Sequence, residues 1–269
     1  MAAADRRWPT NVRSADNGHE RKNHGRLWVD DLVPQIHDVS KPVLSSATNS
    51  VDFFFDPVCP FAWVTSRWVV QVAGLRDLDV QWRFISLRMI NVSKNYDTDF
   101  PEGYRKAHGA GLRMLRVAAE ARQSLGNDAV GSLYTSFGAS IWDHAPTPGS
   151  LMRPDAGEPD HLLAALQDAG LPAELANAAD DETHDELIAA ETEMALTRAG
   201  RDVGTPIITF GAPDGPSFFG PVISRLPSDD DAVRLWDAVE TLAGFDSFSE
   251  LKRSLRELPN LRSLSGYTG

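Results

Sequence analysis

Three consecutive segments of the chain alternate between the patterns of a strand and a helix. Residues 51–55 form an apolar, aromatic run that predicts a buried strand, and Asp56-Pro57 ends it. Apolar residues then recur at helical spacing over 59–75, and residues 80–87 alternate as a second strand does. A strand, a helix and a strand in this order form a crossover, which requires the two strands to be parallel.

A long stretch of helical patterns follows this crossover. Four segments carry apolar residues at helical spacing: 102–125, 128–142, 160–169 and 181–199. Prolines and glycines mark a loop over 145–159, and a proline in the first turn predicts a further helix start at 171–174. The middle of the chain is therefore predicted to be helical.

Strand patterns return in the last part of the chain. Residues 205–210 and 217–219 are rich in β-branched and aromatic side chains, and a turn sequence separates them. A helix is predicted over 229–243, with Ser228 as its N-cap, and a last short helix over 251–258. The order βαβ, helical block, ββα predicts an α/β protein with a thioredoxin fold that is split by a large helical insertion.

This order of elements suggests a division of the chain into four parts. Residues 1–48 are polar and irregular, and we expect them to form a flexible extension. A thioredoxin-like domain is predicted over 49–93 and 201–258, an inserted helical domain over 94–200, and a C-terminal tail over 259–269. A chain of 269 residues is long enough for one large domain of this kind.

The net charge of −12 comes largely from one region of the chain. Between residues 154 and 193 there are twelve acidic residues and no lysine or arginine. Such a segment repels nucleic acid and anionic membranes. We expect it to be a solvated face of surface helices, since charged residues are mostly exposed.

Membrane and export signals are not visible in the sequence. No stretch approaches the roughly 20 apolar residues of a membrane helix, and the N-terminus has no apolar run behind its charged residues. The single cysteine excludes a disulfide framework within the chain. We therefore expect a cytoplasmic protein with neither a membrane nor a nucleic acid as a partner.

Cys59, the single cysteine, lies where the first strand gives way to a helix. At a helix N-terminus, unpaired backbone N–H groups and the positive end of the dipole favour an anion. The pKa of Cys59 is therefore expected to fall below about 8.5. Pro60 suits the first helical turn, where its missing N–H costs nothing. The alternative is an inert buried cysteine, but the position of Cys59 favours a reactive thiol.

The dipeptide Thr205-Pro206 lies directly before a predicted strand. In thioredoxin folds, the loop at this place carries a cis-proline that faces the active-site cysteine. Cis X–Pro bonds are uncommon, at about 5–6% of cases, and occur where geometry matters. The alternative is an ordinary trans proline that opens a strand. The order of the elements favours a cis Pro206 that faces Cys59.

Short motifs along the chain resemble one protein family. The first is the run 55–63 (Phe-Asp-Pro-Val-Cys-Pro-Phe-Ala-Trp), followed by Thr65-Ser66-Arg67-Trp68. The later motifs, in chain order, are Ser86-Leu87 with Ile90-Asn91, Pro101-Glu102-Gly103-Tyr104-Arg105, Gly204-Thr205-Pro206, Phe218-Phe219-Gly220-Pro221 and Glu250-Leu251-Lys252-Arg253. Over about 51–258, the chain resembles the DsbA-like proteins of actinobacteria, and among them the mycothiol-dependent reductases and nitroreductases.

The resemblance implies a fold, a reductant and a set of site residues. The fold is the DsbA-like thioredoxin fold with a helical insertion, and the reductant is a low-molecular-weight thiol, mycothiol, that meets a small electrophilic substrate in a cleft. Cys59 would be the nucleophile. The residues that would bind the thiol or the substrate are Pro60, Phe61 (in place of a tryptophan of the family motif), Trp63, Asn91, Tyr104, Thr205 and Pro206.

One departure from the family pattern changes the expected chemistry. The usual motif is Cys-Pro-x-Cys, whereas this chain has Cys59-Pro60-Phe61-Ala62. Without a second cysteine, no internal thiol can release a mixed disulfide. A monothiol cycle remains, in which a second mycothiol from solution releases the first. The site could also bind mycothiol without a covalent bond and present its thiolate to the electrophile.

A different class of function stays open beside the enzyme. A redox-inactive DsbA-like protein would bind a peptide or protein through the groove at the cis-proline. Phe61, Trp63, Phe218 and Phe219 would then form the apolar wall of that groove.

Other cofactors have no support in the sequence. The seven histidines show no metal-ligand spacing, and no glycine-rich loop follows a strand as in flavin or nicotinamide sites. We expect no metal, flavin or nicotinamide. The sequence leaves open whether the protein forms a homodimer and whether another thiol, such as glutathione, replaces mycothiol.

Overall fold

The computed structural model describes residues 49–147, 150, 152–253 and 257–264. The chain divides into two units, Met1–Pro42 and Val43–Gly269, and all described residues belong to the second unit. The flexible extension expected over 1–48 lies outside the described residues, as does 265–269 of the expected tail.

Four strands form one sheet in the order β2-β1-β3-β4. They are β1 (Ser50–Phe55), β2 (Asp79–Phe84), β3 (Ile207–Phe210) and β4 (Ser217–Phe219). β1 pairs with β2 in parallel, as the predicted crossover requires, and β3 is antiparallel to both β1 and β4. This order and these directions are those of the thioredoxin fold, which confirms the predicted fold class.

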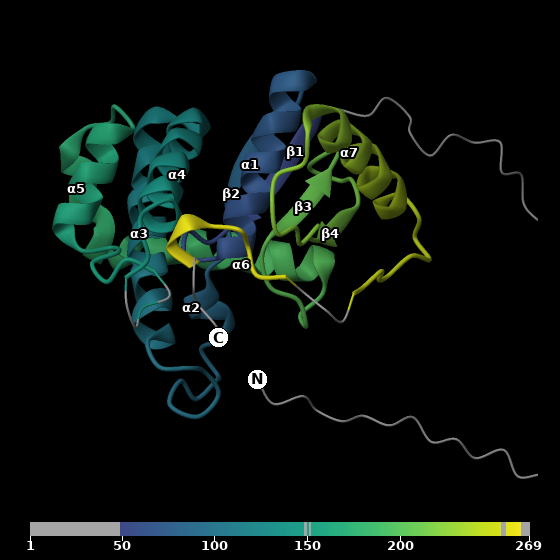
Figure 1. The fold of residues 1–269 in the computed structure, drawn as a ribbon. Coiled ribbons are helices and arrows are strands. Elements are labelled where there is room, and N and C mark those ends of the chain that lie inside the picture. Colours follow the sequence, from purple (N-terminus) through teal and green to yellow (C-terminus); the bar gives the residue numbers. More distant parts are fainter. Residues whose placement is uncertain (1–48, 148–149, 151, 254–256, 265–269) are drawn as a thin grey trace, which may run out of the picture. The chain divides into compact units, whose positions relative to one another are not determined.

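Helices account for most of the remaining described residues (Figure 1). The α-helices are α1 (Pro60–Leu75), α2 (Leu87–Ile90), α3 (Tyr104–Leu125), α4 (Asn127–Trp142), α5 (Pro159–Asp168), α6 (Asp185–Ala199) and α7 (Asp229–Ala243). Three short 3-10 helices are η1 (Ala173–Asp180), η2 (Glu182–His184) and η3 (Arg262–Leu264). The helices from α3 to α6 lie between β2 and β3 in the sequence, where the insertion was predicted.

The two faces of β1 pack against different helices. Alternate side chains of a strand point to opposite faces. Phe53 and Phe55 join the large core with residues of α1, α4 and α7, whereas Phe54 packs on the other face with Ala195 of α6. β1 is therefore buried on both faces, which explains its almost uninterrupted apolar sequence.

α4 is one of the helices inserted between β2 and β3, and it packs against the core next to β1 and α1. The ring of Tyr134 stacks on Phe55 with a centroid separation of 3.8 Å. Further along α4, a Cβ at Gly138 would lie 2.1 Å from the ring of Trp63. A residue without a side chain thus lets α4 approach α1 closely, and this contact fixes the helical segment against the sheet.

A buried group of charges joins the sheet to α3 and α6. Glu191 of α6 accepts hydrogen bonds from Arg122 at 2.9 Å and from Arg83 at 3.1 Å, and Arg83 also pairs with Asp52 of β1 at 3.0 Å. Arg198 reaches the other oxygen of Asp52 at 2.9 Å. Only 4% of Glu191 is exposed. The expectation that the acidic segment 154–193 is wholly solvated is therefore wrong at this residue.

Two predicted elements end differently in the structure. The strand predicted over 80–87 ends at Phe84, because the Ser86 side chain accepts a hydrogen bond from Met89 and caps the short helix α2. The helix predicted over 251–258 is wrong for the described residues 251–253 and 257–258, which are not helical. Leu251 is 84% exposed there and has no core to pack against.

The described end of the chain connects two parts of the fold. The backbone N–H of Asn260 donates to the carbonyl of Ser224, in the loop after β4, at 2.6 Å. Leu261 and Leu264 are buried in the large core, and η3 contacts α4. Residues 257–264 are thus packed against the fold rather than extended away from it.

Candidate active site

Cys59 forms the turn between β1 and α1 and is the N-cap of α1. Its backbone N–H donates to the carbonyl of Asp56 at 3.0 Å, and its sulfur accepts the N–H of Ala62 at 3.4 Å. A hydrogen bond from an N–H at the start of a helix stabilises negative charge on the sulfur. The structure therefore places Cys59 at the helix terminus that the sequence predicted.

The loop before β3 brings Thr205 and Pro206 to this sulfur. The Thr205–Pro206 peptide bond is cis. The thiol of Cys59 donates to the carbonyl of Thr205 at 3.5 Å, and the Thr205 hydroxyl donates to the carbonyl of Phe54 at 3.2 Å. Cys59 and the residue before the cis bond are thus in contact, although they lie far apart in the sequence.

The predicted lowering of the Cys59 pKa is wrong in this structure. Burial raises the pKa of Cys59 to about 12, because only 8% of the residue is exposed and a buried thiolate loses its hydration. The backbone N–H groups of Ala62 and Phe61 lower it, and the charge of Asp56 raises it further. At neutral pH the thiol is therefore protonated, which agrees with its hydrogen bond to the Thr205 carbonyl.

Asp56 is a feature of this site that our sequence analysis missed. Its carboxylate is fully buried and accepts the N–H of Val58 at 3.1 Å and the N–H of Leu87 at 2.8 Å. Burial raises the pKa of Asp56 to about 7, although these two hydrogen bonds lower it. An aspartate three residues before the cysteine was the available signal, but its burial depends on residues distant in the sequence.

Two helices of the inserted segment pack directly on the thiol turn. The indole N–H of Trp142, at the end of α4, donates to the carbonyl of Pro57 at 3.1 Å. On α3, a Cβ at Gly111 would lie 2.6 Å from the carboxylate of Asp56 and 3.0 Å from Val58. The conformation of the turn that holds Cys59 therefore depends on both α3 and α4.

The predicted residues at the start of α1 lie in different surroundings. Pro60 and Phe61 are partly buried, and Phe61 packs against the core. Trp63 is only 4% exposed, and its ring lies between α4 and the guanidinium of Arg67, which is 4.2 Å from the ring centroid. Trp63 thus supports α1 from within the core, whereas the sequence suggested that it helps to form the apolar wall of a groove.

Asn91 is linked to the thiol turn through α2. Its side-chain amide donates to the carbonyl of Leu87 at 2.8 Å, and the N–H of Leu87 donates to Asp56. Asn91 therefore caps the short helix whose first N–H group holds the buried carboxylate. The structure connects Asn91 to Cys59 by this chain of contacts.

Tyr104 begins α3 within a group of aromatic rings. It stacks on Phe100 with a centroid separation of 5.7 Å and meets His108 edge-on at 5.6 Å. Tyr104 precedes Gly111, the α3 residue at the thiol turn, by seven residues, which is about 10 Å along a helix. Tyr104 therefore lies on the helix that covers the turn, about two helical turns from the point of contact.

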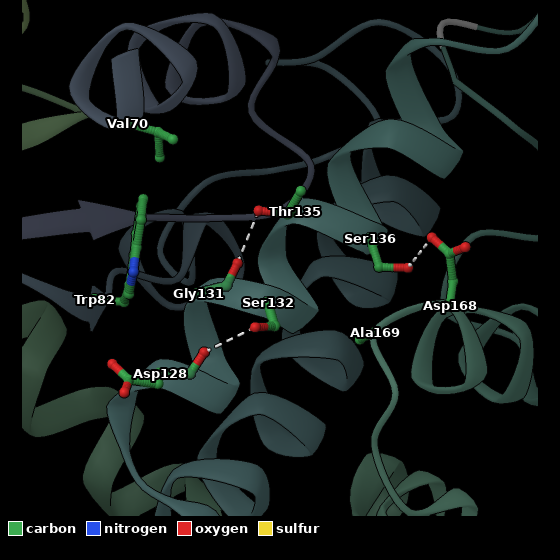
Figure 2. A pocket seen from close by; sticks show the side chains of 9 residues that line it. All are labelled: Val70, Trp82, Asp128, Gly131, Ser132, Thr135, Ser136, Asp168 and Ala169. Atoms are coloured by element: carbon green, nitrogen blue, oxygen red, sulfur yellow. Dashed lines mark hydrogen bonds between the residues drawn. The ribbon is translucent and has the colours of Figure 1, made fainter. Parts of the chain in front are cut away.

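A pocket among the described residues lies elsewhere. Its volume is about 520 Å³, and α4 contributes most of its lining, including Asp128 and Thr135. Figure 2 shows that its hydroxyl groups are already engaged: Thr135 donates to the backbone of its own helix, and Ser136 donates to Asp168. None of the predicted site residues lines this pocket.

Metal-ligand clusters and membrane-spanning helices are both absent from the described part of the chain. Among these residues, no three His, Cys, Asp or Glu side chains are grouped as metal ligands would be. No helix within the described ranges is long and apolar enough to cross a membrane.

The contacts around Cys59 define what the site can do chemically. As a thiolate, a sulfur beside the backbone of Thr205 can attack one sulfur of a small disulfide and form a mixed disulfide, while the other sulfur leaves as a thiolate. Ala62, three residues on and fully buried, has no sulfur with which to release such an adduct. A mixed disulfide on Cys59 could therefore be released only by a thiol from outside the chain, because the chain has no second cysteine.

Comparisons with known proteins give a consistent result. The sequence model of the Rv2466c-like family, described as "Mycothiol-dependent nitroreductase Rv2466c", matches residues 58–253. The protein Rv2286c of Mycobacterium tuberculosis, described as uncharacterized, is 31% identical over 212 residues, which cover 76% of this chain and 82% of that protein.

Two solved structures also resemble the chain. A probable DsbA oxidoreductase, SCO1869 from Streptomyces coelicolor, is 15% identical with a TM-score of 0.44 over 76% of this chain and 93% of its own. The cytosolic disulfide reductase DsbM from Pseudomonas aeruginosa is 18% identical with a TM-score of 0.44 over 72% of this chain and 99% of its own.

Proposed function

The chain belongs to the Rv2466c-like family of thiol-dependent oxidoreductases, and we propose that it works as a monothiol enzyme with mycothiol as its cosubstrate. In this cycle, the Cys59 thiolate attacks a disulfide that contains mycothiol. A sulfur–sulfur bond forms between Cys59 and mycothiol, and the other sulfur leaves as a thiolate. A second mycothiol thiolate then attacks the sulfur of the bound mycothiol, and Cys59 leaves as a thiolate.

The contact between Cys59 and Thr205 is the observation that carries this proposal. The sulfur lies 3.5 Å from the Thr205 carbonyl, beside the cis bond to Pro206. A thiol ligand in a mixed disulfide with Cys59 would lie against this backbone, and the partly buried Phe61 lies at the start of the same helix. Ala62 makes the release step intermolecular, since position 62 supplies no second thiol.

A mass-spectrometric experiment tests the covalent cycle. The reduced protein is incubated with oxidised mycothiol, and intact mass is measured before and after reduced mycothiol is added. We expect one mycothiol per chain, loss of the adduct on adding reduced mycothiol, and no adduct on Cys59→Ser. The absence of an adduct on the wild type, or an adduct that persists in Cys59→Ser, would contradict the proposal.

A variant at position 62 gives a matched control for the release step. In Ala62→Cys the new thiol can attack Cys59 and release mycothiol without a second molecule, so the adduct should not accumulate. Ala62→Ser introduces a side chain of similar volume to cysteine but no thiol, so this variant should keep the adduct. Equal adduct levels in the two variants would show that position 62 does not control release.

The burial of Cys59 favours a second candidate function, in which mycothiol is bound without a covalent bond. A thiol that is neutral at neutral pH can line a site that binds mycothiol without a covalent bond and presents its thiolate to an electrophile. This mode should survive in Cys59→Ser, whereas the covalent cycle should not. Turnover of an electrophile with reduced mycothiol in this variant therefore separates the two modes.

A further inference from the structure

Residues 257–264, which we call the C-terminal strap, lie against the fold with one side buried. Leu261, Ser263 and Leu264 are buried, whereas the residues directly before and after Leu261 are exposed. The two leucines belong to the same core cluster as Cys59. One side of the strap therefore faces the interior in which the thiol lies.

The first half of the strap is attached beside the cis-proline. The backbone N–H of Asn260 donates to the carbonyl of Ser224, in the loop that follows β4, at 2.6 Å. At the start of this loop, the N–H of Gly220 donates to the carbonyl of Pro206 at 2.9 Å. The carbonyl of the next residue accepts a hydroxyl from α1 at 2.9 Å. The Ser224 loop therefore lies against both the cis-proline and α1.

The second half of the strap reaches α4, which also contacts the thiol turn. η3 is the last part of the strap and contacts α4. Figure 1 shows the strap in yellow as it passes from the side of the sheet to that of α4. Trp142, the last residue of α4, donates to the carbonyl of Pro57, two residues before Cys59. The strap thus runs between two neighbours of the thiol turn, the loop at the cis-proline and α4.

The thiol is closed off in this structure. Cys59 is buried, and its sulfur lies between the N–H of Ala62 and the carbonyl of Thr205. Thiol–disulfide exchange requires access of the attacking sulfur to the disulfide. For Cys59 to react, an element that covers it must therefore move.

The contacts of the strap are those of a segment that can detach. The buried hydroxyl of Ser263 has no hydrogen-bond partner among the described residues, and such a hydroxyl is costly to bury. Release of the strap would expose it to water. Glu257 pairs with Arg225 at 3.3 Å, but both side chains are mostly exposed, so this ion pair contributes little to holding the strap.

We propose that the C-terminal strap is a gate over Cys59, which opens when the strap detaches from α4 and from the Ser224 loop. The inference rests on the proposed thiol chemistry and adds a step before it. With the strap attached, the sulfur is shielded; with the strap released, a small thiol or disulfide reaches it. No covalent bond forms or breaks in this step.

Alkylation of Cys59 by iodoacetamide, followed by intact mass at a fixed pH, measures the opening. The double variant Leu261→Ala/Leu264→Ala loses apolar contacts of the strap and should react about tenfold faster or more, because the open state becomes more populated. Leu258→Ala is the matched control, because this leucine of the same strap is 52% exposed, and it should react at the wild-type rate. A folded double variant that reacts at the wild-type rate overturns the proposal, as does an equal increase in Leu258→Ala.

A measurement on the wild type separates opening of the strap from global unfolding and decides the test even if the double variant does not fold. Below the urea unfolding transition, the alkylation rate should rise with a shallow slope, because release of the strap exposes far less surface than unfolding does. A rate that stays constant up to the transition, and then follows the loss of circular dichroism, would overturn the proposal.

Neither measurement uses mycothiol, so the gate and the proposed cycle can fail separately. A strap response without a mycothiol adduct would contradict the monothiol cycle and leave the gate standing. An adduct on the wild type, together with a double variant that is alkylated at the wild-type rate, would contradict only the gate.

Discussion

At the scale of single residues, glycines decide how closely the helices approach the thiol turn and the core beneath it. Gly111 lets α3 lie against the Asp56 carboxylate, and Gly138 lets α4 lie against the ring of Trp63. Each lacks the Cβ that would collide with its neighbour. Because glycine is unfavourable inside a helix by about 0.5–1 kcal/mol relative to alanine, its presence here marks contacts that a side chain would break.

Two glycines in α3 give a matched pair for a first prediction. Gly109→Ala should stabilise the protein by about 0.5–1 kcal/mol, because a Cβ there meets no atom within 4 Å. Gly111→Ala should destabilise it by about 1–3 kcal/mol, because the new Cβ would displace Asp56. Urea unfolding measures both changes. If the two variants shifted the midpoint in the same direction, the close approach of α3 to the turn would be wrong.

At the scale of elements, the buried charges hold α6 and α3 on the sheet. Glu191 receives hydrogen bonds from two arginines and from the backbone N–H of Phe84, at 2.8 Å. These contacts satisfy a carboxylate that would otherwise be costly to bury. They also fix the register between β2 and α6, since the bond to Phe84 involves the main chain of the strand.

Two glutamates of α6 allow the contribution of the buried charges to the free energy of unfolding to be measured. Glu191→Gln should cost about 1.5–3 kcal/mol of unfolding free energy, because it weakens charge-assisted hydrogen bonds from the partly buried guanidinium groups of Arg83 and Arg122. Glu193→Gln removes an exposed ion pair with Arg201 and should change stability by less than about 1 kcal/mol. Equal unfolding midpoints for the two variants would show that the buried group is not a stabilising link.

Local patterns allowed much of the element order to be predicted. Residues 51–55 and the helix after Cys59 were recognisable because their apolar spacing and the proline at the helix start are local features. The end of β2 was not recognisable from the sequence. The Ser86 side chain accepts a hydrogen bond from the Met89 N–H and begins a helix, whereas the alternation of apolar residues alone suggested that the strand continued. The helix expected over 251–258 failed because a run of helical residues needs a core face, which Leu251 lacks.

The candidate site was predictable to a smaller extent. Cys59, Thr205 and Pro206 followed from the order of strands and helices. The burial of Asp56 did not, because it depends on Gly111 and Leu87, which reach the turn only in the folded chain. The pKa of Cys59 depends on the same burial, so a helix N-terminus seen in the sequence could not give even the direction of its change.

At the scale of the whole molecule, buried histidines set the response to acid. His108 is hydrogen-bonded to Tyr96 at 2.8 Å, and His161 lies between Ser140 and the N–H of Gly157. Burial lowers the pKa of each imidazole from 6.5 to about 4. The Nδ1 of His161 accepts a backbone N–H, so the neutral ring matches its surroundings and the charged ring does not.

This arrangement predicts a loss of stability in mild acid. Between pH 6.5 and 4 the unfolded chain binds more protons at these histidines than the folded chain does. Their contribution to the stability of the folded state therefore falls as the pH falls through this range. Asp56 acts in the opposite sense, because its raised pKa favours the fold at low pH and costs stability as the pH rises from 3.8 to about 7.

Thermal unfolding at several pH values measures the net effect of these histidines and Asp56 on stability. We expect the midpoint to fall by about 5 °C between pH 7 and pH 5, with a smaller fall in His161→Asn, which cannot take up the proton. Asp56→Asn should show a larger fall than the wild type, because it removes the opposing contribution. A midpoint independent of pH over this range, or parallel profiles for the three proteins, would contradict this account.

The hydrogen bond from Trp142 to Pro57 has a practical consequence for the study of this site. Trp142 is 2% exposed, and its indole N–H donates to the carbonyl two residues before Cys59. Any event that displaces the turn must lengthen or break this bond, and indole emission responds in colour and intensity to such a change. Subtracting the spectrum of Trp142→Phe isolates that contribution from the other six tryptophans. The protein thus carries its own optical reporter, and the proposed reaction at Cys59 can be followed in real time without a dye.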